Sequence, residues 1–316
     1  MNKLNKLLFV FLALALLLCG CSTKTANNLA ADNTIKITDS GGKTVILPST
    51  PKVVSCHASL SECWLLAGGD LVGVTEDVIS DRGLLKENNA KVIGTVKNID
   101  MEKVAALNPD YVILSSDLAA HIRLKTNLDK LNIPYGFFKE DTFNDYSSVM
   151  SAFCGVTGRQ DLFNENVTAV KQRIDEIKAK IPKGTTKTAL LARVFSTGMK
   201  AKTDDNSAGI ILKELGIKNI VEDYPSALDE LSTELIIKSN PDFVLTYAMG
   251  DEDGAKAYLK SNFEDSPAFN GLKAVKNNCY HLLPKRLFHY KPNNRWAQSY
   301  KYIADILYSE ADNYDK

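Results

Sequence analysis

MEKVAALNPDYVIL, at residues 101–114, and TELIIKSNPDFVLT, at residues 233–246, are the two stretches that decide the fold. In both, a glutamate, Glu102 or Glu234, lies seven residues before a proline, and Asn-Pro-Asp leads into an aromatic residue and an apolar run. The glutamate suits the first turn of a helix, where the helix dipole favours negative charge. The Asn-Pro pair ends that helix, because the residue before proline is driven out of the α region. The apolar run is typical of a strand buried on both faces, so each copy predicts a helix, a turn and a strand.

The residues before each copy correspond as well. In the first half the pattern predicts a strand at 52–55, a helix through 62–67 that stops at Gly68-Gly69, and a strand at 71–74. In the second half it predicts a strand at 189–195, a helix at 208–215 that stops at Gly216, and a strand at 217–221. Strands that alternate with helices in this way form parallel sheets. The sequence therefore predicts an α/β fold of two lobes, each with a mainly parallel sheet and flanking helices.

A long helix is expected between the two halves. Residues 159–181 contain no glycine or proline, and apolar residues recur at Leu162, Val167, Val170, Ile174, Ile177 and Ile181. From Val167 onwards the intervals alternate between three and four residues, the pattern of an amphipathic helix, and Pro182 stops it. The predicted organisation is an N-terminal lobe at 35–156, one connecting helix at 157–182 and a C-terminal lobe at 183–316.

The N-terminus has the pattern of a lipoprotein signal peptide at residues 1–21. Lys3 and Lys6 precede an unbroken apolar run at 7–18, which is the length of a signal-peptide core and too short to span a bilayer comfortably. Gly20 precedes Cys21, and this resembles the motif at which bacterial lipoproteins are cleaved and lipidated on cysteine. An ordinary signal peptide with incidental cysteines is the alternative. The polar residues 22–34 would then form a flexible tether, and the protein would be anchored to the membrane rather than span it.

Composition excludes some classes of protein. Lys+Arg and Asp+Glu both number 38, and no basic stripe is visible, which argues against a nucleic-acid-binding role. The motifs GxxxxGK[ST], GxSxG, HExxH and CxxC are absent, so the sequence does not favour an enzyme. Cys56, Cys63, Cys154 and Cys279 match no zinc or redox spacing and are expected to be buried apolar residues, with a Cys56–Cys63 disulfide left open.

Residues 35–307 resemble the ABC-importer binding proteins that carry iron–siderophores, haem and cobalamin. The twin repeat is the most specific element, and the segment at 35–45, a strand, an Asp-Ser-Gly-Gly turn and a second strand, resembles the N-terminal hairpin of that family. The resemblance implies that Glu102 and Glu234 dock into arginine pockets of an ABC permease, which works with an ATPase. It also implies a monomer at the outer face of the cell membrane that binds an iron chelate as its ligand and needs no cofactor.

Ligands of open parallel sheets bind beyond the carboxyl ends of the strands, so the candidate site lies in the loops at 56–59, 115–118, 196–200 and 247–251. Arg193 is the most informative candidate, because a charge inside a strand needs a partner or a cavity. Arginine suits the anionic groups of ferric chelates. The expected ligand-binding residues are His57, Ser59, Asp117, His121, Arg193, Lys200, Tyr247, Met249, His289 and Arg295. Solvated loops without a ligand role are the alternative for each of these loops.

Other ligands and roles stay open at this point. A free divalent metal would be held by His57, His121 and a carboxylate such as Asp251. Haem or cobalamin would suit the same fold. A sensor or adhesion protein would need no permease docking, so uptake by Glu102 and Glu234 variants separates it from an importer component. His281 lies in a strand-like alternation and is expected to be structural.

Overall fold

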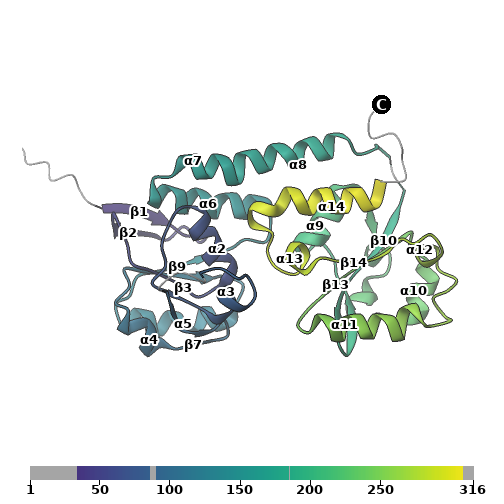
Figure 1. Ribbon diagram of the computed structural model, residues 1–316, viewed down its shortest axis with the longest axis horizontal. Coiled ribbons are helices and arrows are strands. Elements are labelled where there is room, and N and C mark those ends of the chain that lie inside the picture. Colours follow the sequence, from purple (N-terminus) through teal and green to yellow (C-terminus); the bar gives the residue numbers. More distant parts are fainter. Residues whose placement is uncertain (1–33, 86–89, 185, 309–316) are drawn as a thin grey trace, which may run out of the picture. The chain divides into compact units, whose positions relative to one another are not determined.

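The structure is a computed structural model that describes residues 34–85, 90–184 and 186–308 (Figure 1). The predicted signal peptide with Cys21, and the tether up to residue 33, lie outside the described residues. Within the described part, no helix is long and apolar enough to cross a membrane.

The first half carries a five-stranded sheet in which every strand pairs in parallel, in the order β5-β4-β3-β8-β9. Its elements are β3 (Val53–Ser55), α2 (Ala58–Leu66), β4 (Gly73–Val74), α3 (Glu76–Ser80), β5 (Lys91–Val92), α4 (Met101–Ala106), β8 (Tyr111–Ser115), α5 (Ala119–Lys130), β9 (Tyr135–Phe138) and α6 (Phe143–Thr157). Two small antiparallel pairs accompany it: β1 (Thr34–Thr38) with β2 (Thr44–Pro48), and β6 (Gly94–Thr95) with β7 (Asn98–Ile99). The N-terminal hairpin is thus confirmed.

The second half repeats this topology. Its elements are β10 (Thr188–Phe195), β11 (Gly198–Ala201), α9 (Ser207–Glu214), β12 (Lys218–Asn219), α10 (Thr233–Ser239), β13 (Phe243–Ala248), α11 (Glu252–Leu259), α12 (Lys273–Lys276), β14 (Tyr280–Leu283), α13 (Lys285–Phe288) and α14 (Trp296–Tyr308). The parallel order β12-β10-β13-β14 matches β4-β3-β8-β9 of the first sheet. The α/β fold with two mainly parallel sheets is therefore confirmed.

One element of the second half was not expected. Ser196 and Thr197 form a tight turn, after which β11 returns antiparallel to β10. The stretch at 196–200 is therefore half turn and half edge strand rather than a free loop. The strand expected at 217–221 is also shorter, because Ile220–Glu222 forms a 3-10 turn behind β12.

The two copies of the repeat fold alike. Helix α4 precedes β8 and helix α10 precedes β13, and Asn108 and Asn240 both adopt the left-handed backbone conformation, with φ of 46° and 42°. All residues of β8 and β13 are buried. The helix, turn and strand that the sequence predicts are present in both copies.

The expected connecting helix is helical over twenty residues but is not a uniform α-helix. It consists of α7 (Gln160–Phe163), the π-helical stretch η1 (Asn164–Thr168) and α8 (Ala169–Ala179). Leu162 and Val167 lie five residues apart, and a π turn keeps such residues on one face. Val167, Val170 and Ile174 are buried, and α8 packs along α14, as the teal and yellow helices in Figure 1 show.

Each sheet is covered on both faces by apolar packing. In the first sheet, Val53 and Ile113 belong to one buried cluster, while Val54 and Val112 belong to another on the opposite face. In the second sheet, Leu191 and Leu245 face the cluster that contains α14, and Leu190 and Val244 face the other. This alternation fixes which strand residues can reach a ligand: those at the carboxyl ends.

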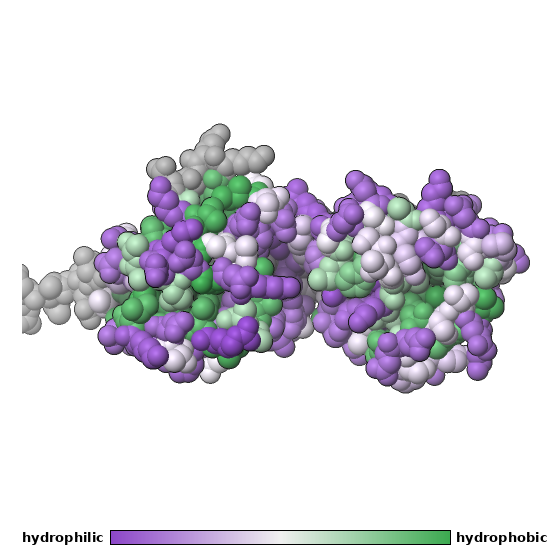
Figure 2. Space-filling view, turned by 90° about the horizontal axis from the view of Figure 1, so that it is seen from below, coloured by the Kyte–Doolittle hydropathy of each residue, from purple (hydrophilic) through white to green (hydrophobic). Residues whose placement is uncertain are grey.

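The surface is mixed in character. On the face shown in Figure 2, purple hydrophilic residues and green hydrophobic residues are interspersed. Exposed large hydrophobic side chains belong to separate elements, for example Ile46 on β2 and Ile122 on α5. Such isolated side chains are normal on a folded protein and call for no partner.

Candidate functional site

Three loops of the first half meet at the carboxyl edge of its sheet. Cys56, just after β3, donates its backbone N–H to Ile113 of β8 at 3.0 Å. Ser116, just after β8, donates its backbone N–H to Phe138 of β9 at 3.0 Å. The residues that follow β3, β8 and β9 are therefore neighbours, as parallel strands require.

His57 lies at this edge against a buried carboxylate. It is the N-cap residue of α2, but its side chain makes no capping hydrogen bond. Its Nδ1 lies 3.4 Å from Oε1 of Glu140, whose side chain is only 3% exposed. Neither of these two atoms makes a hydrogen bond in the described part of the chain. Glu140 was not among the predicted residues, although its place two residues after β9 is a signal that a search of every strand end would have used.

His121 does not share the role expected for it. The ring is fully buried, Nδ1 accepts the backbone N–H of Ser115 at 3.0 Å, and Nε2 lies 3.0 Å from the carbonyl oxygen of Val96. Burial, followed by the charge of His57, lowers the pKa of His121 to about 4. With both nitrogens engaged by backbone, His121 has none to offer a ligand and instead fixes the loops around it.

Asp117 belongs to a small charged group with Asp141, Lys139 and Lys291. Partial burial, and then the negative charge of Asp141, raise the pKa of Asp117 above its usual value. Burial alone would raise the pKa of Asp141 too, but the hydrogen bond and charge of Lys291 lower it. Asp117 thus stands beside an ion pair, at the edge where the sequence placed it.

Arg193 lies near the carboxyl end of β10 in a row across the second sheet. Its strand partners in register are Lys200 on β11 and Tyr247 on β13, so the three side chains share one face. The guanidinium lies 5.6 Å from the ring centre of Tyr247, and Nη1 lies 3.5 Å from Sδ of Met249. Its Nε is buried without a hydrogen-bond partner, and among the described residues no carboxylate pairs with it.

His289 adds an imidazole close to this row. It follows α13, its Nδ1 is buried without a hydrogen bond, and burial followed by the charges of Lys285 and Arg193 lowers its pKa to about 4. The ring centre of the next residue, Tyr290, lies 5.6 Å from the guanidinium of Arg82 and 5.5 Å from Nζ of Lys285. The predicted set Arg193, Lys200, Tyr247, Met249 and His289 is thus gathered at one edge.

Ser59 and Arg295 are used differently from what the sequence suggested. Arg295 binds Glu62 through two hydrogen bonds, Nη1 to Oε1 at 2.7 Å and Nη2 to Oε2 at 2.9 Å. Arg82 pairs with the same carboxylate. Ser59 donates to Asn293 at 3.0 Å, and Asn293 donates to Glu62 at 2.7 Å. This buried network ties α2 to the segment before α14, so both residues hold the fold together rather than face a ligand.

The set proposed for a free divalent metal is not assembled as such a site. His121 is engaged by backbone, and Asp251 accepts the N–H of Asp253 as the N-cap of α11. In residues 34–85, 90–184 and 186–308, no three His, Cys, Asp or Glu side chains form a group that could hold a metal ion. Cys56, Cys63 and Cys154 are buried free thiols, so no Cys56–Cys63 disulfide is present, and Cys279 is partly exposed.

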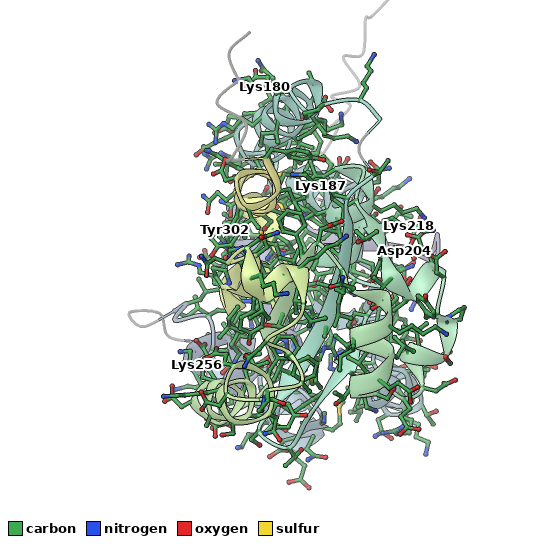
Figure 3. The ribbon with its side chains drawn as sticks, turned by 90° about the vertical axis from the view of Figure 1, so that its right-hand side faces the viewer. Lys180, Lys187, Asp204, Lys218, Lys256 and Tyr302 are labelled. Atoms are coloured by element: carbon green, nitrogen blue, oxygen red, sulfur yellow. The ribbon has the colours of Figure 1, made fainter. Side chains whose placement is uncertain are left out.

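Two hollows of the described surface lie away from these strand ends. One, of about 730 Å³, runs between α8 and α14 and includes Lys180 and Lys301. Another, of about 520 Å³, lies at the amino ends of β13 and β14 and includes Lys187 and Tyr302. Figure 3 labels Lys180, Lys187 and Tyr302 among the side chains of this part. Ligands of parallel sheets bind at the opposite, carboxyl ends, so these hollows are not the expected site.

Glu102 and Glu234 have equivalent places. Both are exposed and lie in the first turns of α4 and α10, behind the N-cap residues Asp100 and Ser232. The helix positions that the sequence predicted are confirmed, while the docking role stays a prediction.

Comparison with known proteins gives a consistent result. The family model for periplasmic binding proteins matches residues 53–287. The Fe(3+)-citrate-binding protein YfmC of Bacillus subtilis is 25% identical over 286 residues, which cover 87% of this chain and 88% of that protein. The probable siderophore-binding lipoprotein YfiY of Bacillus subtilis is 26% identical over 299 residues, which cover 89% and 90%.

Solved structures agree in fold. The TroA-like periplasmic binding protein FepB of Veillonella parvula superposes with a TM-score of 0.70 at 19% identity, over 87% of this chain and 90% of that one. Staphylococcus aureus IsdE, solved in complex with heme, superposes with a TM-score of 0.63 at 18% identity, over 82% and 99%.

Proposed function

Because this chain belongs to the periplasmic binding protein family, we propose that it is the extracytoplasmic substrate-binding protein of an ABC importer and binds an anionic iron chelate. The ligand lies against the carboxyl ends of the two sheets, with Arg193 and Lys200 on one side and His57 on the other. Haem and corrinoids are the alternative ligands for the same site.

The single observation that carries the proposal is the state of Arg193. It is half-buried, its Nε makes no hydrogen bond, and its cross-strand neighbour is another cation, Lys200. Like charges that face each other across strands destabilise a sheet, and a buried cation without a counter-charge costs free energy. A carboxylate or catecholate of the ligand would relieve both, through the paired hydrogen bonds that a guanidinium offers.

Two relatives support an iron chelate as the ligand. One is named as a protein that binds ferric citrate and the other as a siderophore-binding lipoprotein. Both classes of complex carry oxygen-rich, anionic groups, which fit the cations at the end of β10. A free divalent metal has less support, because His121 is engaged by backbone.

The family supports a proposal for the partners and the location. The protein would deliver its ligand to a two-fold ABC permease with its ATPase, as a monomer held at the outer face of the membrane by lipid on Cys21. The relative YfiY is named as a lipoprotein, which supports the anchor. The protein itself is proposed to carry out no reaction and to need no cofactor.

Binding of ferric citrate, ferric siderophores and haem by the purified full chain tests the proposal, with Arg193→Gln and Arg193→Lys alongside. Loss of a charge-assisted hydrogen bond is worth roughly 1.5–3 kcal/mol, so Arg193→Gln should weaken binding of the cognate anion about 10- to 100-fold. Arg193→Lys keeps the charge but loses the paired geometry and should fall between. The matched control is Lys218→Gln, which removes a cation on the exposed start of β12.

Two results would count against the proposal. Unchanged affinity in a folded Arg193→Gln protein would remove this residue from the site. Failure of the unaltered protein to bind any of the three ligand classes would contradict the function itself.

A further inference from the structure

His57 and Glu140 carry an inference that rests on the proposed function and deepens it. We infer that His57 donates its Nε2 to the iron of the incoming chelate and that Glu140 positions the ring for this bond. The site therefore selects ferric complexes whose iron keeps an open or water-filled coordination position. The iron of a complex whose chelator occupies all six positions cannot bind His57, so this residue does not strengthen the binding of such a complex.

The first step is the unusual state of Glu140. Its side chain is 3% exposed, and its hydrogen-bond partner in the described part of the chain is the thiol of Cys63, whose Sγ lies 3.6 Å from Oε2. A thiol is a weak donor, and a buried carboxylate requires strong ones. No lysine or arginine of the described residues pairs with Glu140, and Nδ1 of His57 lies 3.4 Å from Oε1.

This contact selects one tautomer of His57. A proton on Nδ1 would lie beside the carboxylate, at a contact of 3.4 Å that has no hydrogen-bond geometry in this structure, and the lone pair would then reside on Nε2. Nδ1 is buried, so the 20% of the side chain that solvent reaches belongs to its other atoms. Among the described residues, Nε2 makes no hydrogen bond, and the side chain does not cap α2 either. The structure thus assigns the ring no role in folding that would occupy this nitrogen.

The neighbouring histidine shows the contrast. His121 lies 6.2 Å from His57 between ring centres, and its two nitrogens both bind backbone. The ring of His121 thus packs edge-on against one side of His57, and Nε2 of His57 is left without a hydrogen bond at the carboxyl end of β3.

The chemistry of such a pair is that of a metal donor. Iron accepts imidazole nitrogen, and histidines that bind metals commonly donate their other N–H to a carboxylate, which orients the ring and strengthens the bond. In the proposed step, Nε2 replaces a water on the ferric iron, the water leaves, and the Nδ1 proton stays in the contact with Glu140. The iron remains ferric, so no oxidant or reductant is needed.

Pulsed EPR on the full chain, labelled with ¹⁵N-histidine and loaded with ferric citrate, tests the bond without any substitution. A nitrogen coupling to the iron is expected from the unaltered protein and should disappear in His57→Gln. His281→Gln, which alters a histidine on β14, is the matched control and should retain the coupling. Glu140→Gln should also retain it while binding ferric citrate about 10- to 100-fold more weakly, the usual effect of losing a carboxylate behind a metal-binding histidine.

Two further ligands test whether binding depends on an open coordination position of the iron. A hexadentate ferric hydroxamate should bind equally to the unaltered protein and to His57→Gln. Haem, if it is the cognate ligand, should show a visible band that shifts on binding and loses this shift in His57→Gln.

The outcomes are distinguishable. Ferric citrate or haem bound without nitrogen coupling or band shift, or bound equally by His57→Gln, would overturn the donor role and leave the proposed function standing. Failure of the unaltered protein to bind any iron complex would overturn the proposed function, and the donor role with it.

Discussion

The arginines of this chain differ in what neutralises them. Arg82 and Arg295 converge on Glu62, whereas Arg193 has no carboxylate partner in the described part of the chain. Burial by itself would raise the pKa of Glu62, but the hydrogen bond from Arg295 and the charges of both arginines lower it below its usual value. Arginine thus stabilises the fold at Glu62, whereas at Arg193 its charge is left without a carboxylate among the described residues.

Glu62→Gln should therefore destabilise the protein strongly. Removing one member of a buried ionic network leaves the other charges uncompensated, which costs about 3–5 kcal/mol. Chemical denaturation at neutral pH measures the loss, with Glu252→Gln, an exposed glutamate that pairs with Lys256, as the control. A loss no larger than that of the control would contradict this account of the network.

The same residue gives a dependence on pH. Because the folded state lowers the pKa of Glu62, its stabilisation is fully present above the ordinary value of 4.5 and is lost as the pH falls through the lower folded value. Between neutral pH and pH 4.5, Glu62→Gln should be destabilised by a constant amount. Below pH 4.5 the difference in free energy of unfolding between the unaltered protein and Glu62→Gln should shrink. A difference that grew as the pH fell would contradict the lowered pKa of Glu62.

At the scale of the elements, the aspartate of each repeat ties neighbouring strands together. Oδ2 of Asp110 accepts the backbone N–H of Lys52, just before β3, at 2.8 Å. Oδ2 of Asp242 accepts the N–H of Thr188, the first residue of β10, at 2.9 Å, and its hydroxyl at 3.0 Å. Each repeat therefore forms a helix, a turn and a strand, and its aspartate also helps to set the register between that strand and its central neighbour.

Asp110→Ala and Asp242→Ala should each lower the free energy of unfolding by about 1–3 kcal/mol. Each substitution leaves a backbone N–H without its acceptor at the start of a strand. Denaturation midpoints measure this, and Asp229→Ala, at an exposed aspartate between η3 (Pro225–Leu228) and α10, is the control. Equal midpoints in all three variants would show that the two contacts contribute nothing.

At the scale of the whole molecule, the duplicated topology places Glu102 and Glu234 at equivalent points of two similar sheets. Each is exposed and lies in the first turn of its helix. As a helix charge alone, each would be worth under about 1 kcal/mol. In the proposed docking role, by contrast, each of the two similar halves of a permease would bind one of these glutamates.

The double variant Glu102→Gln, Glu234→Gln separates these readings. Docking predicts that ligand affinity and stability barely change while transport in a reconstituted system falls, more than in either single variant. Exposed charge pairs with the permease would also make the complex weaker at high salt. Glu165→Gln, an exposed glutamate in the connecting helix, is the control. Full transport by the double variant would contradict the docking role.

The sequence by itself determined the elements of this protein, because their signals are local. The twin repeat predicted α4 with β8 and α10 with β13, and the alternating spacing from Val167 predicted the face of α8 that packs inward. The tertiary structure alone decided which polar residues are available. Arg295 meets Glu62 across 233 positions of the chain and Ser59 meets Asn293 across 234, so no pattern of spacing could reveal that both are engaged. Likewise, His57 and His121 look alike in the sequence, and only the folded chain shows that backbone groups engage both nitrogens of His121, whereas His57 lies beside the buried Glu140 without a hydrogen bond from Nδ1. Periodicity records which face of an element is buried, whereas the pairing of charges depends on contacts between segments that the chain brings together only when it folds.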